Sequence, residues 1–214
     1  MDRAAFIWAT IDDERGSLAD LLAQLPATGW ECASLCAGWR VRDVAAHLAL
    51  AHTGARAALP ALLRARGSFD RMVDQTARAH AVVPTGQVVA EIRAMRGSRR
   101  HAVGTSIVEP LTDVLVHGQD IARPLGVERP VRPAAAAIAA DRVWTMNWPF
   151  WPRRRLRGLA LEATDHPWRV GTGEPVAGPM GDLLLLLTGR TCVVDRLGGD
   201  GVPVLRRRLD AACQ

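Results

Sequence analysis

The stretch Asp113-Val-Leu-Val-His117-Gly-Gln-Asp120 combines an apolar helical pattern with a group of ionisable side chains. Residues four apart on an α-helix are displaced by only about 40° around its axis, so Asp113 and His117 point the same way. A carboxylate and an imidazole on one inward face can chelate a metal ion. Because Asp–His pairs at this spacing also form on helix surfaces, the spacing alone leaves both interpretations open.

An earlier helix offers a third ligand for such a site. The segment Trp39-Arg-Val-Arg-Asp-Val-Ala-Ala-His47 predicts a helix that carries His47 in an apolar stretch. Two histidines and one carboxylate leave coordination positions open for water or substrate, as in catalytic zinc and non-haem iron sites. Helical bundles build metal sites from such facing side chains. The predicted ligands are therefore His47, Asp113 and His117, although His47 alone also fits a hydrogen-bonded core histidine.

Apolar residues at helical spacing continue outward from this stretch through the first two thirds of the chain. Beyond them, short alternating segments are typical of strands. The sequence predicts helices over about 4–25, from 40 or 41 towards 54, 69–82, from 85, 110–124 and 134–146, and a loop over 28–39. It then predicts strands at 159–163 and 168–170, a turn at 171–175, and helices at 179–187 and 202–211.

The composition changes at Trp148-Pro-Phe-Trp-Pro152, a segment that fits a linker better than a helix. A length of 214 residues suits one large domain, or one domain with a small appendage. We therefore expect a mainly α protein, with a helical bundle over 1–147, a linker over 148–154 and a small α+β domain over 155–214.

The chain is basic, with a formal net charge of +5 when histidine is counted as neutral. All 27 of its basic residues are arginine, against 22 acidic residues. The arginine clusters lack the interleaved aromatic residues of single-strand-binding surfaces, so we interpret them as solvated faces and expect no nucleic-acid partner. No apolar run approaches the ~20 residues that a membrane span needs, and no secretory signal is visible. We expect a cytoplasmic protein without membrane association, whose cysteines are free thiols: Cys32, Cys36, Cys192 and Cys213.

Three segments of the chain resemble, in order, the motifs of one known family. The segment Cys36-Ala-Gly-Trp-Arg-Val-Arg-Asp-Val-Ala-Ala-His47-Leu resembles the second-helix signature of the mycothiol-dependent maleylpyruvate isomerase family, which belongs to the DinB-like metal-binding bundles. Residues 113–126 are similar to its second metal signature, and residues 176–190 resemble the motif of its C-terminal domain. The sequence departs from the family at Asp113, where the isomerase has a glutamate with a longer side chain.

The resemblance implies a DinB-like four-helix bundle followed by a small α+β domain. It implies a divalent metal ion, commonly zinc, held by His47, Asp113 and His117, and mycothiol as the thiol cosubstrate. It also implies a catalytic role for Arg190, whose guanidinium suits a carboxylate-bearing substrate. From the residues alone, Arg190 fits equally well a cation at the C-terminus of a helix.

The expected function is a metal-dependent isomerase or thiol S-transferase whose partners are a small thiol and a small electrophile. The alternative is a non-catalytic metal- or ligand-binding protein on the same scaffold, because function follows the site rather than the fold. Asp120 and His52 lie close in sequence to the predicted ligands His117 and His47. Asp120 either fixes the His117 ring or pairs with Arg123, and the ion pair is slightly favoured. His52 lies about 140° from His47 around one helix, so we do not expect both to bind one ion.

Overall fold

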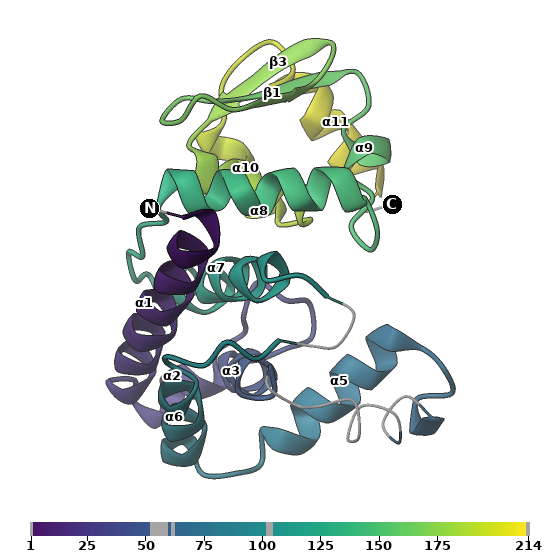
Figure 1. The fold of residues 1–214 in the computed structure, drawn as a ribbon. Coiled ribbons are helices and arrows are strands. Elements are labelled where there is room, and N and C mark those ends of the chain that lie inside the picture. Colours follow the sequence, from purple (N-terminus) through teal and green to yellow (C-terminus); the bar gives the residue numbers. More distant parts are fainter. Residues whose placement is uncertain (1, 52–59, 61–62, 102–104, 213–214) are drawn as a thin grey trace. The chain divides into compact units, whose positions relative to one another are not determined.

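The computed structural model describes residues 2–51, 60, 63–101 and 105–212 (Figure 1). The chain divides into two compact units, Met1–Arg129 and Pro130–Gln214. Each unit has its own set of packed elements and is described by itself.

Four helices of the N-terminal unit form the predicted bundle. Helices α1 and α3 each pack against both α6 and α7. A fifth helix, α5, packs on α3, and a short helix, α2, precedes α3 (Figure 1). The bounds are α1 (Arg3–Ala23), α2 (Ala27–Glu31), α3 (Val41–Ala49), α5 (Phe69–His80), α6 (Thr85–Ala94) and α7 (Val108–Ala122).

The apolar residues that predicted these helices form the interior of the bundle. They recur at helical spacing, so each helix presents one apolar face to its neighbours. Burial of an aliphatic side chain of this kind contributes roughly 1.5–3 kcal/mol. Five of them from four helices are at most 5% exposed in one cluster: Leu18, Val44, Leu48, Ile92 and Ile121.

The C-terminal unit combines four α-helices, a 3₁₀ helix and a three-stranded sheet among its described residues. The strand order is β2-β1-β3; β2 runs antiparallel to β1, and β3 runs parallel to it. The bounds are α8 (Pro133–Met146), α9 (Pro152–Arg155), β1 (Leu159–Ala163), β2 (Arg169–Gly171), β3 (Glu174–Gly178), α10 (Met180–Leu187), η1 (Thr191–Arg196) and α11 (Val202–Ala212).

Helix α10 is the centre of this unit. Its five consecutive leucines, 183–187, make it apolar on every side, and each of them is at most 1% exposed. A helix that is apolar all round must be covered all round. It packs against α8, η1 and β1, and Figure 1 shows it between the sheet and α8.

The boundary between the two units differs from the expected one. The sequence predicted that the bundle extends to residue 147, which would place α8 in the N-terminal unit. In the structure α8 packs against α10, so it belongs to the C-terminal unit. The segment expected as a linker, residues 148–154, contains part of α9 and lies inside the same unit.

Strand β3 replaces part of the turn expected over 171–175. The chain leaves β2 on one side of β1 and enters β3 on the other, so it crosses the first residues of β1. Glycine is required at this crossing, because a Cβ on Gly173 would lie 2.1 Å from the Gly158 carbonyl oxygen and its φ is +123°. The Gly/Pro-rich composition that suggested a turn thus serves a close approach of two backbones.

Two expected features fall wholly or partly outside the described residues. Helix α3 ends at Ala49, whereas the pattern extended it towards residue 54. His52 and Cys213 lie outside the described residues. Within the described residues, no helix has the length and apolar character needed to cross a membrane.

The start of α3 yields a stability prediction. The fully buried carboxylate of Asp43 accepts hydrogen bonds from the backbone N–H of Arg40 at 2.9 Å and from its Nε at 3.0 Å. Asp43→Ala leaves these donors without an acceptor, so we expect it to lower the free energy of unfolding by about 1–3 kcal/mol. Glu31→Ala removes a half-exposed partner of the same arginine and should cost at most about 1 kcal/mol. Chemical denaturation measures both; equal losses would contradict the role given to Asp43.

Candidate metal centre

The first predicted ligand, His47, lies on α3 beside a second histidine. Its ring lies 5.6 Å from the Trp39 ring and 5.0 Å from the His117 ring, measured between centroids. Within the described residues the His47 nitrogens make no hydrogen bond. The structure therefore brings together two of the three predicted ligands, from two different helices, and leaves the His47 nitrogens available to a ligand.

Helix α7 holds His117 in one orientation. The Nδ1 atom of His117 donates to Oδ2 of Asp120 at 2.8 Å, and the Asp120 carboxylate is fully buried. Carboxylates commonly fix metal-binding histidines in this way, because a proton held on Nδ1 leaves the lone pair on Nε2. Of the two contacts that the sequence offered Asp120, the hydrogen bond to His117 is thus present, although it was the less favoured one.

Cys36 completes this cluster and was not predicted as part of it. Its Sγ atom donates to Oδ2 of Asp120 at 3.1 Å and lies 3.7 Å from Nδ1 of His117. In the described part of the chain, one group of three potential ligand atoms lies within 4.8 Å of one another: Cys36, His117 and Asp120. Cys36 stands in the same motif as His47, but its approach to Asp120 spans 84 residues, so no local spacing signalled it.

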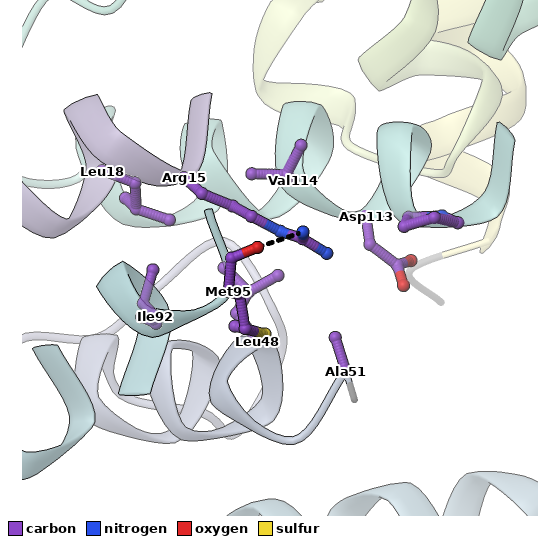
Figure 2. Close-up of a pocket in the computed structure, with 9 residues that line it drawn as sticks. Arg15, Leu18, Leu48, Ala51, Ile92, Met95, Asp113 and Val114 are labelled. Atoms are coloured by element: carbon purple, nitrogen blue, oxygen red, sulfur yellow. Dashed lines mark hydrogen bonds between the residues drawn. The ribbon is translucent and has the colours of Figure 1, made fainter. Parts of the chain in front are cut away.

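Asp113, the predicted third ligand, lies one turn before His117 on α7. Asp113 is one of the residues that line a small, mainly apolar cavity, together with Arg15 of α1 and Met95, which follows α6 (Figure 2). The structure does not gather His47, Asp113 and His117 as closely as it gathers the Cys36 cluster. Asp113 thus shares a helix with His117 and faces a cavity within the bundle.

The two histidines have opposite electrostatic environments. Burial and, to a smaller extent, the neighbouring His117 together lower the pKa of His47 to about 3. Burial also opposes the charge on His117, but hydrogen bonds to Asp120 and Cys36 outweigh it and raise the pKa of His117 to about 10. At neutral pH the metal-free protein therefore carries an uncharged His47 beside a protonated His117.

The geometry of the two rings fits a shared metal ion. In a tetrahedral zinc site with Zn–N bonds of about 2.0–2.1 Å, two imidazole ring centres lie roughly 5 Å apart. The centroids of His47 and His117 are 5.0 Å apart. The donor set of two imidazoles and a carboxylate also suits zinc or ferrous iron.

Arg190, the predicted catalytic residue, follows α10 in the C-terminal unit. Its NH1 atom donates to the backbone carbonyl of Thr188 at 2.8 Å. This contact is the one expected of a cation that satisfies carbonyl groups at a helix C-terminus. Arg190 thus makes the contact expected of a cation that stabilises the end of a helix, and its catalytic role stays a prediction.

Comparisons with known proteins agree with this architecture. Residues 11–104 match the family model of the mycothiol maleylpyruvate isomerase N-terminal domain, a range that contains His47 but not Asp113, His117 or Arg190. No curated protein matches the sequence. The crystal structure of the mycothiol-dependent maleylpyruvate isomerase is 12% identical, with a TM-score of 0.61 over 93% of both chains. The structure of a histidine-to-alanine mutant of that isomerase is 10% identical, with the same TM-score and coverage.

These likenesses confirm the expected fold class. At 12% identity a structural match shows a shared fold, here a mainly α protein with a small sheet in its C-terminal part. The family match to the N-terminal domain over residues 11–104 confirms the resemblance for the first of the three sequence motifs, and the motifs at 113–126 and 176–190 lie outside the matched range. The individual site residues are not tested by these comparisons.

The raised pKa of His117 predicts how stability depends on pH in the metal-free protein. Its folded pKa of about 10 lies above the ordinary 6.5, so its stabilising contribution is complete below about pH 6.5 and is lost as the pH rises towards 10. We expect the free energy of unfolding, measured with a chelator present, to fall over this window. His117→Gln should remove that fall.

His47→Gln is the matched control for this measurement. The folded pKa of His47 lies below 6.5, so its contribution changes only between about pH 6.5 and 3, where acidification destabilises the folded state. The alkaline fall should therefore persist in His47→Gln. An alkaline limb that is identical in the wild type and in His117→Gln would contradict the assignment.

Proposed function

We propose that this protein is a metal-dependent enzyme that uses mycothiol as its thiol cosubstrate, because residues 11–104 match the model of the mycothiol maleylpyruvate isomerase N-terminal domain. The reaction is an isomerisation or a thiol S-transfer on a small electrophile that bears a carboxylate. The proposed location is the cytoplasm, where reducing conditions keep small thiols available, and none of the described cysteines forms a disulfide.

The observation that carries the proposal is the approach of two imidazoles from separate helices, with one of them already oriented. His47 and His117 lie at 5.0 Å between ring centroids, and the Nδ1 proton of His117 is held by Asp120. In the proposal, His47, Asp113 and His117 hold a divalent metal ion, most simply zinc. An aspartate in place of the family's glutamate keeps the ligand chemistry but shortens the side chain.

The metal ion would stabilise the thiolate form of the cosubstrate at an open coordination position. The chain supplies the rest. Asp120 holds a proton of His117 on Nδ1, so Nε2 is the atom that would bind the metal ion, which displaces the second proton of the imidazolium. Cys36 donates to the same carboxylate oxygen and restrains it from a second direction. Burial keeps His47 uncharged, so no proton competes for its lone pair near neutral pH.

The role proposed for Arg190 is recognition of the substrate carboxylate. A guanidinium offers N–H donors in a planar fork that matches the geometry of a carboxylate. A bidentate contact with a carboxylate is stronger and more directional than a contact from an ammonium group. Support for this role comes from the motif in residues 176–190 that resembles the family's C-terminal motif.

Removal of His117 tests the metal site. His117→Ala deletes a ligand and the partner of Asp120, so we expect metal affinity to fall by more than about 100-fold and mycothiol-dependent turnover to be lost with it. His80→Ala is the matched control, because His80 is half-buried and pairs with Glu91 on neighbouring helices away from the site. Metal content by elemental analysis and thiol consumption measure the two effects. Full metal content in His117→Ala would reject the proposed ligand set.

Removal of Arg190 separates metal binding from substrate recognition. We expect Arg190→Ala to retain metal and to lower kcat/KM by at least about tenfold, because a charge-assisted hydrogen bond to the substrate is lost. Arg154→Ala, an exposed arginine of the same unit, should leave the kinetics unchanged. If Arg190 only satisfies the end of α10, its loss costs roughly 0.3–1 kcal/mol of stability and turnover stays intact. A metal-loaded protein without turnover on any electrophile would favour the non-catalytic alternative.

A further inference from the structure

Among the described residues, the ring of His47 has no hydrogen bond that fixes its orientation. Metal-binding histidines usually donate their second ring N–H to a carboxylate, a carbonyl or water, and this contact sets the direction of the ring. Asp120 makes that contact with His117. The His47 ring is restrained instead by packing between two other rings. Trp39 lies 5.6 Å from it between centroids, tilted by 57°, and His117 lies at 5.0 Å.

Trp39 is itself fixed at its backbone and at its side chain. Its carbonyl oxygen accepts hydrogen bonds from the backbone N–H of Ser34 at 2.9 Å and from the Oγ of Ser34 at 2.8 Å. Its indole N–H donates to Oδ1 of Asp74 on α5 at 2.8 Å. Because the indole cannot rotate without breaking this bond, the ring that packs on His47 keeps one orientation.

Helix α5 also restrains the acceptor of the indole bond. Arg78 on α5 donates from Nε to Oδ1 of Asp74 at 2.8 Å and from NH2 to the carbonyl of Gly38 at 2.7 Å. The hydrogen bonds from Trp39 and Arg78 lower the pKa of Asp74, so its carboxylate is charged at neutral pH and both contacts are charge-assisted. Two residues one turn apart on α5 therefore bind two consecutive residues that precede α3.

Packing on the core is the simpler role for Trp39. The indole packs against the apolar cluster of the bundle, and an indole N–H that leaves water needs an acceptor in any case. The two roles differ in what the contact with Asp74 does. If Trp39 only packs, loss of the contact lowers stability and leaves the His47 ring where it is. If Trp39 positions His47, the same loss frees the ring.

We propose that Trp39 is the positioning residue of His47: its indole, held by Asp74 of α5, keeps the His47 ring turned towards His117 in the metal-free protein. The inference rests on the proposed function only where it treats His47 as a metal ligand. A ring that is already oriented loses less freedom when an ion binds, so the contact raises metal affinity although neither Trp39 nor Asp74 is a ligand. Helix α5, which carries no proposed ligand, thus supports the metal centre.

The first test removes the indole contact without changing the core. Asp74→Leu deletes the acceptor at a side chain that is 43% exposed, so we expect the protein to fold. Asp74→Asn is the matched control, because it breaks the same ion pair with Arg78 but keeps an oxygen that accepts from the indole. We expect zinc affinity, measured by competition with a chelating dye, to fall by about tenfold in Asp74→Leu and by less than about twofold in Asp74→Asn. Once Trp39→Phe has removed the indole N–H, Asp74→Leu should weaken binding no further.

NMR of the metal-free protein tests the ring itself. Nuclear Overhauser cross-peaks from the His47 ring protons to the rings of Trp39 and His117 should be present in the wild type and in Asp74→Asn, and weakened in Asp74→Leu. Trp30→Phe is the control for lost packing, because Trp30 is a buried residue of the same apolar cluster. It should lower the free energy of unfolding and leave both the cross-peaks and the zinc affinity unchanged.

The results separate this inference from the proposed function. Unchanged cross-peaks in Asp74→Leu, or equal losses in Asp74→Leu and Asp74→Asn, overturn the inference while the metal site stands. Losses in Trp30→Phe as large as those in Asp74→Leu also overturn it, because any damage to the bundle would then move the ring. A protein that holds no zinc rejects the proposed function, and the cross-peaks of the metal-free protein still decide whether Trp39 positions His47.

Discussion

The buried carboxylate of Asp120 is the contact on which the site depends. Its side chain accepts hydrogen bonds from His117 and Cys36, and its backbone carbonyl accepts one from the N–H of Leu35. A single residue of α7 thus orients the ring of one proposed ligand and also anchors the loop that leads into α3, the helix that carries His47. Because the carboxylate is fully buried, loss of His117 or Cys36 removes a hydrogen-bond donor from a charge in the interior.

Sequence periodicity was sufficient for the longer helices and for the pair of histidines, because both follow from which residues share a helix face. It did not reveal the short helices α2 and α9, which lie where a loop over 28–39 and a linker over 148–154 were expected. It could not reveal that Cys36 reaches Asp120, since that contact joins a loop to a helix 84 residues later. Strand β3 was missed because Pro175 and the glycines around it are typical of turns, and here they permit the chain to cross β1. The apolar face of α8 predicted a helix but not its partner, which is α10.

Because the fold is shared at low sequence identity, the function of this protein depends on the residues of its site and not on its fold. A fold preserved at 12% identity tolerates almost any surface and much of the interior, so individual contacts decide the chemistry. The bundle holds an uncharged histidine, an oriented histidine and a buried arginine in the described residues of one unit.

The crossing of the chain over β1 has a consequence for how the C-terminal unit assembles. All strand pairs of its sheet lie between Leu159 and Gly178, so every ladder joins residues that are close in sequence. Two parallel strands usually need a long connection. Here the connection between β1 and β3 consists of the short strand β2 and a glycine-containing turn. Its loop-closure entropy is correspondingly small, so this sheet is a low-contact-order element that can form before α8 and α10 meet.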